Sequence, residues 1–303
     1  MEIAVVGLGR MGANVARRLL RGGHRVVAYD ADRTLVETIV AEGATGAASI
    51  EEAVGKLHAP RAVWVMVEAG DTTRSVLSEL RTRLTPGDVV IDAGDSDWRD
   101  DAARADAFAG AGIAYLDVGV AGGVHGLVEG YCLMIGGDKA AVERMKNLFD
   151  DLAAPQGLAH VGRPGAGHYA KMVHHAIEYG MMESLAEGFE LLRGAPQGLD
   201  VAQIANLWRH GSVVRSWLLD LTHATLKKDA KLDAVTGHVQ DSSEGRWAVE
   251  TAIAQESPCT VLAASLFARF RSRQADSYAM KLQAAVRREF SGEAAPAPAR
   301  PSA

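Results

Sequence analysis

The sequence is poor in cysteine, has no dense cluster of positive charge and contains no long apolar run. Only two of its 303 residues are cysteines, Cys132 and Cys259, which argues against a disulfide framework and a cysteine-rich metal site. The net charge of −6 argues against nucleic acid or an anionic membrane as a partner. No apolar stretch has the length of a membrane span, and no basic region precedes the apolar N-terminal run as in a signal peptide. We therefore expect a cytoplasmic protein with no membrane association and no metal site.

The first half of the chain alternates short runs rich in valine and isoleucine with amphipathic segments. Strands are predicted for the ranges 2–8, 25–30, 61–68, 88–94, 113–119 and 131–137. Amphipathic segments such as 14–23 and 33–43 lie between them and predict helices. Such alternation is typical of a doubly wound parallel sheet. We therefore predict an α/β, Rossmann-like domain over residues 1–163.

Beyond residue 163 the apolar periodicity becomes helical, and no alternating strand pattern is found. Helices are predicted for the ranges 167–193, 200–210, 212–227, 246–256, 258–270 and 276–290. This pattern predicts an all-α C-terminal domain over residues 164–290. The last segment, 291–303, is rich in proline and alanine and is predicted to be disordered.

A glycine motif at the end of the first predicted strand indicates a dinucleotide site. Gly7, Gly9 and Gly12 form a G-x-G-x-x-G pattern that follows a strand and opens a helix. The first glycine permits a tight turn, the second lets the backbone approach a pyrophosphate, and the third lets helix and strand pack closely. The helix N-terminus then faces the phosphates. The residues expected to contact the cofactor are Gly7, Leu8, Gly9, Arg10, Met11, Gly12, Asp30, Val67 and Asp95.

Asp30 ends the second predicted strand, about 20 residues after the glycines, where the motif calls for an acidic residue. A carboxylate there accepts hydrogen bonds from both ribose hydroxyls and repels a 2′-phosphate. Asp30 therefore favours NAD over NADP. Arg33 lies close by in the sequence and can tolerate a 2′-phosphate, so NADP is kept as the alternative cofactor.

Two later loops are expected to lie near the nicotinamide, because ligands of doubly wound sheets bind beyond the carboxyl ends of the strands. Asp95 follows the fourth predicted strand, and Ala121, Gly122 and Gly123 follow the fifth. The backbone N–H groups of the two glycines can bind a substrate carboxylate. A plain turn is the alternative interpretation of this pair.

The segment 165–180, GAGHYAKMVHHAIEYG, is predicted to be helical and to place four polar residues on one face. Lys171, His174, His175 and Glu178 lie at positions i, i+3, i+4 and i+7. This face is either exposed to solvent, with a His174–Glu178 pair, or catalytic. Lysine and glutamate are rarely buried unless they are paired or functional. The GAG sequence before the helix indicates close approach of another backbone or a ligand, which favours the catalytic interpretation.

Several motifs resemble those of one known family, from residue 1 to about residue 290. They are GLGRMG, DAGDS, GVAGG with HGLVEGYCLMIGG, GAGHYAKMVHHAIEYGMM, DSSEGRW and ASLFARFRSRQ. Together they resemble 6-phosphogluconate dehydrogenase, decarboxylating, in its short bacterial form that often prefers NAD, within the β-hydroxyacid dehydrogenase superfamily. The resemblance implies hydride transfer from carbon 3 of a sugar acid, loss of CO2, and protonation of the enediol to a ketopentose phosphate.

The resemblance also implies residue roles. Lys171 is expected to take the hydroxyl proton and then to polarise the ketone, and Glu178 is expected to protonate the enediol. A substrate phosphate is expected at Tyr179, Arg246 and Arg269, since paired arginines suit a dianion. Further substrate contacts are expected from Asp95, Ala121, Gly122, Gly123 and His174, and His175 is placed in the catalytic set. A homodimer or homotetramer is implied, because active sites of this family borrow a partner's C-terminal segment.

The sequence departs from the family at the expected substrate site. The family usually has Asn where Asp95 stands, Ser where Ala121 stands and Asn where His175 stands, and its N-Q-F-G-G-H tail is here REFSGE, residues 288–293. A carboxylate beside an anionic sugar acid is unfavourable unless it is protonated or paired. Either Asp95 forms an ion pair with His175, or it meets a cationic group such as the amine of a modified sugar acid.

Three functions stay open on the sequence. The leading hypothesis is NAD-dependent oxidative decarboxylation of 6-phosphogluconate or a close analogue. The first alternative is a dehydrogenase of a modified, for example amino, sugar acid or of another 3-hydroxy acid. The second is a catalytically weak homologue that binds the cofactor. Retention of Lys171, Glu178 and the glycine motif argues against the second alternative.

Overall fold

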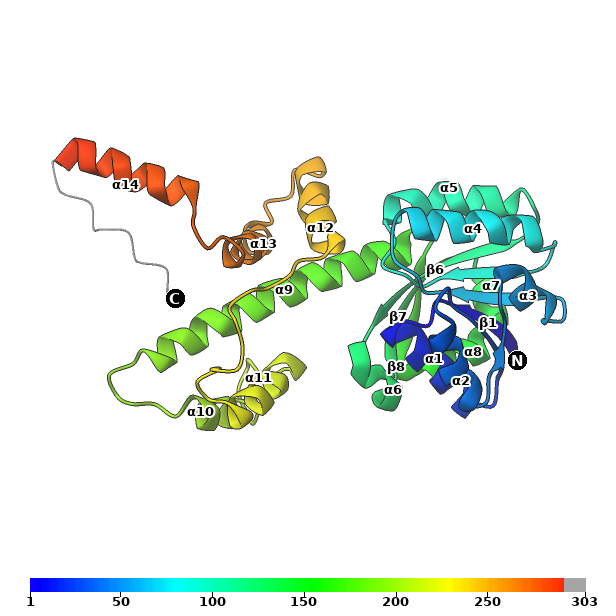
Figure 1. Cartoon of the computed structure of the whole chain (residues 1–303), viewed down its shortest axis with the longest axis horizontal. Coiled ribbons are helices and arrows are strands. Elements are labelled where there is room, and N and C mark those ends of the chain that lie inside the picture. The colour runs from blue at the N-terminus through cyan, green and yellow to red at the C-terminus, as the bar shows by residue number, and fades with distance from the viewer. Residues whose placement is uncertain (292–303) are drawn as a thin grey trace. The chain divides into compact units, whose positions relative to one another are not determined.

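The computed structural model describes residues 1–291, which belong to two compact units. Unit 1 spans Met1–Glu178, and unit 2 begins at Tyr179. The division falls inside one long helix, α9 (Ala166–Arg193), so this helix contributes to both units (Figure 1). The domain boundary predicted at residue 163 lies just before this helix. Within residues 1–291, none of the helices combines the length and the apolar character needed to cross a membrane.

Unit 1 is built on one eight-stranded sheet of order β3-β2-β1-β4-β5-β6-β7-β8. The strands are β1 (Glu2–Val6), β2 (Arg25–Tyr29), β3 (Thr45–Gly46), β4 (Ala62–Val65), β5 (Val89–Asp92), β6 (Ala114–Ala121), β7 (Tyr131–Gly137) and β8 (Ala153–Gly162). The first six run parallel, whereas β7 pairs antiparallel with β6 and parallel with β8. This order confirms the predicted α/β, Rossmann-like class.

Helices cover both faces of this sheet (Figure 1). Those that precede α9 are α1 (Arg10–Arg21), α2 (Arg33–Ala41), α3 (Ile50–Gly55), α4 (Asp71–Arg83), α5 (Trp98–Ala109), α6 (Gly126–Glu129), α7 (Lys139–Arg144) and α8 (Lys146–Leu152), with the 3-10 turn η1 (Gly123–His125). Successive strand residues point to opposite faces, so the apolar core has two layers. Ile3 and Ile91 pack into the layer of α1, α2 and α8, and Ala4 and Val90 into that of α3, α4 and α5.

All six predicted strands are present, but the sheet is not parallel throughout. The connection from β6 to β7, residues 122–130, is too short for the crossover that two parallel neighbours need. The sequence patterns do not predict β3 or β8. Strand β3 is only two residues long, and β8 contains Pro155 and Gly157 and is largely exposed, which obscures its alternation.

Unit 2 consists of helices joined by loops and contains no strand in its described part, residues 179–291, as predicted. After α9 come α10 (Val201–Trp208), α11 (Trp217–Lys228), α12 (Ser243–Ala254), α13 (Thr260–Ser272) and α14 (Tyr278–Ser291). Helix α11 begins later than the predicted residue 212, because Ser216 caps it and accepts a hydrogen bond from the Leu219 N–H.

A small apolar core of unit 2 joins α9, α10 and α11 through Phe189, Val201 and Leu219. Helix α9 also packs against α13, where a Cβ at Gly180 would lie 3.3 Å from Val261 Cγ1. The predicted disordered tail, 291–303, lies outside the described residues except for Ser291, which is helical and ends α14.

Candidate active site

The glycine loop between β1 and α1 has the space that a dinucleotide backbone requires. Gly7 has φ +96°, and a Cβ there would lie 2.3 Å from the Met66 carbonyl oxygen, so only glycine fits. A Cβ at Gly12 would lie 2.0 Å from the Gly7 carbonyl oxygen, so the third glycine lets α1 approach the loop. Nothing lies within 4 Å of the Cβ position of Gly9, which leaves that backbone open to a ligand.

The N-terminus of α1 offers hydrogen-bond donors to an anion. Helix α1 begins at Arg10 with Gly9 as its N-cap, and no side chain caps it. The first N–H groups of a helix have no partner inside the helix and attract phosphate together with the helix dipole. Asp30 accepts hydrogen bonds from Leu8 N at 2.6 Å and Asp32 N at 2.8 Å. Its oxygens keep lone pairs for ribose hydroxyls, so these residues fit NAD.

The loops after β4 and β5 lie beside the glycine loop. Val67 Cγ1 is 2.9 Å from the Cβ position of Gly7, and the Val67 carbonyl oxygen is 2.9 Å from that of Gly94. Asp95 is the next residue and is exposed. The structure therefore brings the loops that carry these predicted cofactor residues to one edge of the sheet. Met11 packs into the core layer of α1, which leaves its backbone for a cofactor contact.

The start of α9 is fixed to the sheet by a carboxylate from β6. Asp117 is fully buried and accepts hydrogen bonds from the backbone N–H groups of Gly165, Gly167 and His168 at 2.8, 2.8 and 3.0 Å. It satisfies the free donors of this helix end as an N-cap side chain does, although it comes from a strand. A Cβ at Gly167 would lie 2.4 Å from the Met134 carbonyl oxygen. The GAG sequence therefore permits close approach of another backbone, one of its two predicted roles.

Lys171 lies at this same contact between helix and strand. A Cβ at Gly119 of β6 would lie 2.4 Å from Lys171 Cβ. The lysine is only 8% exposed, and its Nζ is 3.8 Å from Asp95 Oδ1. The Asp95 side chain is 68% exposed, so solvent weakens this ion pair. The structure thus pairs Asp95 with the predicted base, and a pair with His175 stays a hypothesis.

The polar stripe continues along α9. The unbroken helix places Lys171, His174, His175 and Glu178 on one face. His174 is exposed, and His175 and Glu178 are half-buried. Although part of His174 is exposed, partial burial of its imidazole and the positive charge of Lys171 lower its pKa, and the negative charge of Glu178 acts against them. His174 is therefore a neutral imidazole near pH 7, able both to donate and to accept a hydrogen bond.

The loop after β6 holds the two predicted carboxylate-binding glycines. Ala121 ends the strand and is buried, and Gly122 and Gly123 follow with φ +133° and +53°. Both glycines are needed for this turn, because side chains disfavour positive φ. Nothing lies within 4 Å of the Cβ position of Gly123, so the backbone of the turn is accessible.

Unit 2 gathers the three residues predicted to hold a phosphate around the segment 240–242. Tyr179 Oη accepts a hydrogen bond from the Ser242 N–H at 2.8 Å. Arg269 Nη1 donates to the Gln240 carbonyl at 2.7 Å. Arg246 Nε donates to the Asp241 carboxylate at 2.6 Å. The Arg269 guanidinium lies 3.5 Å from the centroid of the Tyr179 ring. The three side chains therefore form one cluster.

Two members of this cluster, Asp241 and Arg273, are absent from the predicted site. Asp241 is paired with both Arg246 and Arg273. Burial raises the pKa of Asp241, but the hydrogen bonds from both arginines outweigh burial and hold this pKa below its usual value. Both arginines also lie over the ring of Phe270. The RFRSRQ motif could have identified Arg273, because it lies four residues after Arg269 and so on the same helix face.

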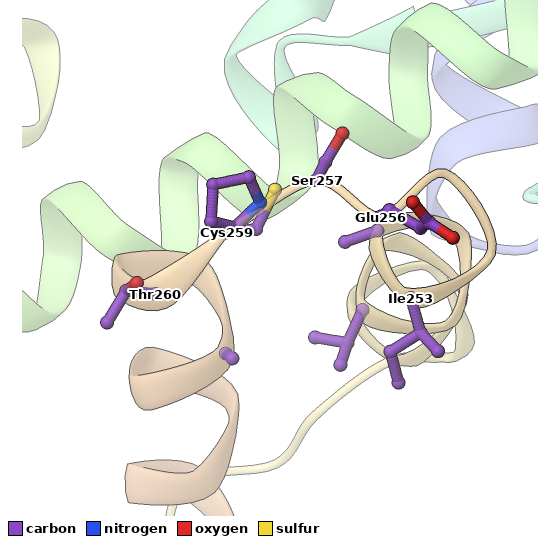
Figure 2. Close-up of a pocket in the computed structure, with 9 residues that line it drawn as sticks. Ile253, Glu256, Ser257, Cys259 and Thr260 are labelled. Carbon is purple, nitrogen blue, oxygen red and sulfur yellow. The ribbon is translucent and has the colours of Figure 1, made fainter.

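Two pockets of unit 2 contain none of the predicted site residues. One, of about 320 Å³, lies between α12 and α13, and Figure 2 shows Ile253, Cys259 and Thr260 among its lining residues. The other, of about 460 Å³, is lined by residues of α9 and α11 such as Phe189 and Leu218. Neither is lined by Lys171 or Glu178.

The chain matches the sequence profiles of two domains of one family. The NAD binding domain of 6-phosphogluconate dehydrogenase matches residues 2–172, and the 6-phosphogluconate dehydrogenase C-terminal domain matches residues 167–296. YqeC of Bacillus subtilis, provisionally named a 6-phosphogluconate dehydrogenase, is 42% identical over 294 residues, which cover 97% of this chain and 99% of YqeC.

A second relative, of Haloferax volcanii, is named 6-phosphogluconate dehydrogenase, NAD(+)-dependent, decarboxylating. It is 39% identical over 292 residues, which cover 96% of this chain and 97% of the relative. The solved structure of Plasmodium falciparum 6-phosphogluconate dehydrogenase has the same fold, with a TM-score of 0.83 at 24% identity over 100% of this chain and 67% of that chain. The chain therefore belongs to the 6-phosphogluconate dehydrogenase family of oxidoreductases and carries that family's NAD-binding domain.

Proposed function

We propose that the protein catalyses the NAD-dependent oxidative decarboxylation of 6-phosphogluconate or a close analogue. The observation that carries this proposal is the polar face of α9, where a buried lysine, Lys171, is followed two turns later by a carboxylic acid, Glu178. The name of the Haloferax volcanii relative supports the reaction and the substrate class. The arginine cluster of unit 2 supports a phosphorylated substrate.

NAD is the proposed cofactor, and NADP the alternative. The Asp30 carboxylate is held by two backbone N–H groups beside the glycine loop, where it repels a ribose 2′-phosphate. Arg33 is exposed at the first position of α2, three residues after Asp30. It is the cation available to a 2′-phosphate, so NADP is expected to be used less well rather than excluded.

Lys171 is the proposed base of the oxidation. Bound NAD supplies the hydride acceptor, and the lysine takes the proton of the substrate hydroxyl as the hydride leaves carbon 3. Asp95 lies 3.8 Å from the lysine and stabilises the ammonium that forms. The neutral His174 is proposed to bind substrate hydroxyls, and the half-buried His175 completes the catalytic set.

The same lysine serves the decarboxylation. Electrons of the breaking carbon–carbon bond move onto the keto oxygen as CO2 leaves, and Lys171 donates its proton to that oxygen. Glu178 then protonates the enediol carbon that lost CO2, and Lys171 accepts the hydroxyl proton as the ketone forms. Gly122 and Gly123, with Ala121, are proposed to bind the carboxylate before it leaves.

Tyr179, Arg246 and Arg269 are the proposed phosphate ligands. The Arg246 guanidinium uses its Nε for Asp241 and is 54% exposed, which leaves its terminal nitrogens available to a dianion. Arg269 is oriented by the Tyr179 ring beneath it. This arrangement favours a phosphorylated over an unphosphorylated sugar acid.

The protein is proposed to act as a homodimer or homotetramer. Helix α14 has no buried residue in the chain, and its Tyr278, Met280 and Phe290 are 78%, 48% and 93% exposed. Apolar side chains exposed together mark protein–protein interfaces. A second copy of the chain is the proposed partner, as the family resemblance implies.

The test measures NADH formation and CO2 release in parallel with 6-phosphogluconate, gluconate and a 2-amino analogue of 6-phosphogluconate. The proposal expects one CO2 for each NADH and turnover of a phosphorylated substrate. Lys171→Met should abolish NADH formation. Glu178→Gln should slow release of the ketopentose product more than NADH formation in a single turnover. NADH without CO2 would show a simple dehydrogenase and overturn the proposal.

One observation favours a modified substrate as the second candidate. The exposed Asp95 carboxylate lies 3.8 Å from the Lys171 amine, and it disfavours an anion more than the usual family amide does. A substrate with an amine beside the reacting carbon would turn this cost into an ion pair. Turnover of the amino analogue that exceeds turnover of 6-phosphogluconate would establish this candidate.

A further inference from the structure

A buried polar cluster joins β5, α5, β6 and the first turn of α9. It consists of Asp92, Asp101, Arg104, Tyr115 and His168. Asp92 and Asp101 are fully buried, and His168 is 3% exposed. The reaction proposed above uses none of these side chains. Two carboxylates face one guanidinium and one imidazole, so the cluster is neutral when the imidazole is protonated.

The links of the cluster are hydrogen bonds of ordinary length. The His168 Nδ1 is 2.8 Å from Asp101 Oδ2, and the Tyr115 hydroxyl is 2.8 Å from Asp101 Oδ1 and 3.0 Å from Asp92 Oδ2. Acid oxygens of Asp92 and Asp101 and a ring nitrogen of His168 lie within 4.8 Å of one another, as in a metal site. Arg104 donates to both carboxylates, at 3.2 and 3.4 Å, and supplies the positive charge there.

The two ends of the cluster reach the two segments that carry the Lys171–Asp95 pair. Asp92 ends β5 and accepts a hydrogen bond from Ser96 Oγ at 2.9 Å, so it fixes the loop in which Asp95 lies. His168 precedes Lys171 by three residues and shares its face of α9. The cluster therefore connects the loop of the carboxylate to the helix of the amine through the protein interior.

We propose that His168 is a positioning residue, which acts through Asp101 and Asp92 to hold Lys171 at its working distance from Asp95. The inference rests on the proposed role of Lys171 as the base. Among the described residues, Asp101 is the one hydrogen-bond partner of the His168 ring, since Nε2 has none. Loss of this link removes the connection from the His168 side chain through Asp101 to β5 and leaves the backbone cap of α9 intact.

The link depends on a proton. Burial lowers the pKa of His168, but the hydrogen bond and charge of Asp101 outweigh burial and raise this pKa to about 9. The carboxylates that act on the ring are Asp101 from α5, Asp92 from β5 and Asp117 from β6. Arg104 and Tyr115 donate hydrogen bonds to the Asp101 carboxylate, and Lys171 lies three residues further along α9. The imidazolium is thus the form at neutral pH, and a neutral side chain at position 168 leaves a carboxylate unbalanced.

Two variants and one matched control test the proposal. His168→Gln and Asp101→Asn each remove one side of the link. Asp88→Asn is the control, because Asp88 is equally buried, precedes the opposite end of β5, and accepts hydrogen bonds from Arg61 N at 2.6 Å and Thr85 N at 2.9 Å. Removal of a carboxylate with a purely structural role should lower the melting temperature and leave the accessibility of the Lys171 amine unchanged.

The first measurement does not depend on the substrate. Reductive methylation of Lys171 by formaldehyde and borohydride is followed by mass spectrometry, with the exposed Lys139 as internal reference. In His168→Gln and Asp101→Asn, we expect the relative labelling rate to rise at least about threefold, and the double variant to add little because both break one link. The control should stay within about 1.5-fold of wild type.

The second measurement is turnover of the best substrate. Both variants should lose roughly 10- to 100-fold in kcat, because a small displacement of a catalytic group is that costly, while the Kd of NAD changes less than about twofold. Wild-type labelling of Lys171 in both variants, or equal effects in Asp88→Asn, would overturn the positioning role. If no sugar acid is turned over, the proposed function fails, and the labelling still decides whether His168 positions the lysine.

Discussion

Gly119 of β6 lies directly beneath the side chain of Lys171. A Cβ at Gly119 would lie 2.4 Å from Lys171 Cβ and 2.8 Å from the Gly167 carbonyl oxygen. Both neighbours are backbone or the first side-chain atom, so neither can move without the helix. The distance of the proposed base from the sheet is therefore set by the absence of one methyl group.

Gly119→Ala should push α9 away from β6 and displace the amine. We expect a loss of about 10²-fold in NADH formation, because misplacement of a catalytic group by about 1 Å is enough for that. Steady-state rates at saturating NAD measure it. Gly188→Ala is the control on the same helix, where nothing lies within 4 Å, and it should stabilise the helix by about 0.5–1 kcal/mol at an unchanged rate. A wild-type rate in Gly119→Ala would mean that this contact does not set the lysine position.

Asp30→Ala should narrow the preference for NAD. The substitution removes the acceptor of the ribose hydroxyls and the charge that repels a 2′-phosphate, so kcat/KM should fall about 10- to 100-fold for NAD and much less for NADP. Asp32→Ala removes a neighbouring carboxylate that caps α2 through Thr34 N. It should cost about 1 kcal/mol of stability and leave the ratio of the two cofactors unchanged. Equal losses with both cofactors in Asp30→Ala would contradict a discriminating role.

Asp95→Asn should lower the KM for 6-phosphogluconate by about two- to fivefold, since an exposed carboxylate no longer opposes an anionic substrate. The difference should shrink as salt is added, because the interaction is screened. Asp97→Asn is the matched control: it removes the same charge from the α5 N-cap, where Asp97 accepts a hydrogen bond from Arg99 N. A KM that rises in Asp95→Asn would mean that Asp95 attracts the substrate, and the amino analogue should then be tested first.

The stability of the protein should decline between neutral and alkaline pH. The folded pKa of His168 is about 9, above the 6.5 of an unfolded chain, so the folded state binds this proton more tightly. The resulting stability is complete below about pH 6.5 and is lost as the pH rises through about 9, to an extent of at most roughly 3 kcal/mol. Urea unfolding at several pH values measures it. His168→Gln should flatten the profile; an unchanged slope would assign the decline to other groups.

The fold class was predictable because buried parallel strands are nearly continuous runs of apolar residues, as Val26 in β2 and Ile91 in β5 illustrate. The stripe on α9 was predictable because helical spacing is local. The contacts that place the stripe were not. Asp117 and the N–H groups it caps lie 48 or more residues apart in the sequence, and no local capping pattern predicts this cap.

The partner of Asp95 was likewise beyond the sequence. Its charge was recognisable as unusual for an anionic substrate, and His175 or a cationic group of the substrate were its candidate partners; the structure adds Lys171, and the pair with His175 stays a hypothesis. Asp95 lies in the loop after β5 and Lys171 lies on α9. The close packing of α9 on the sheet depends on Gly119 and Gly167. In a sequence pattern, a glycine inside a strand indicates only a weak strand former. Which neighbouring atoms its missing side chain allows to approach is visible only in the folded structure.

The cap on α9 fixes the rotation of the polar stripe about the helix axis. Because Asp117 of β6 binds the first turn of the helix, it fixes the rotation of every later helix position about the helix axis relative to β6. Insertions between β6 and Gly165 can lengthen loops without turning the stripe. A single residue inserted between Gly165 and Lys171 would rotate the lysine by about 100° and its acid partner with it. Natural length variation in this protein is therefore expected before that glycine and not in the six residues after it.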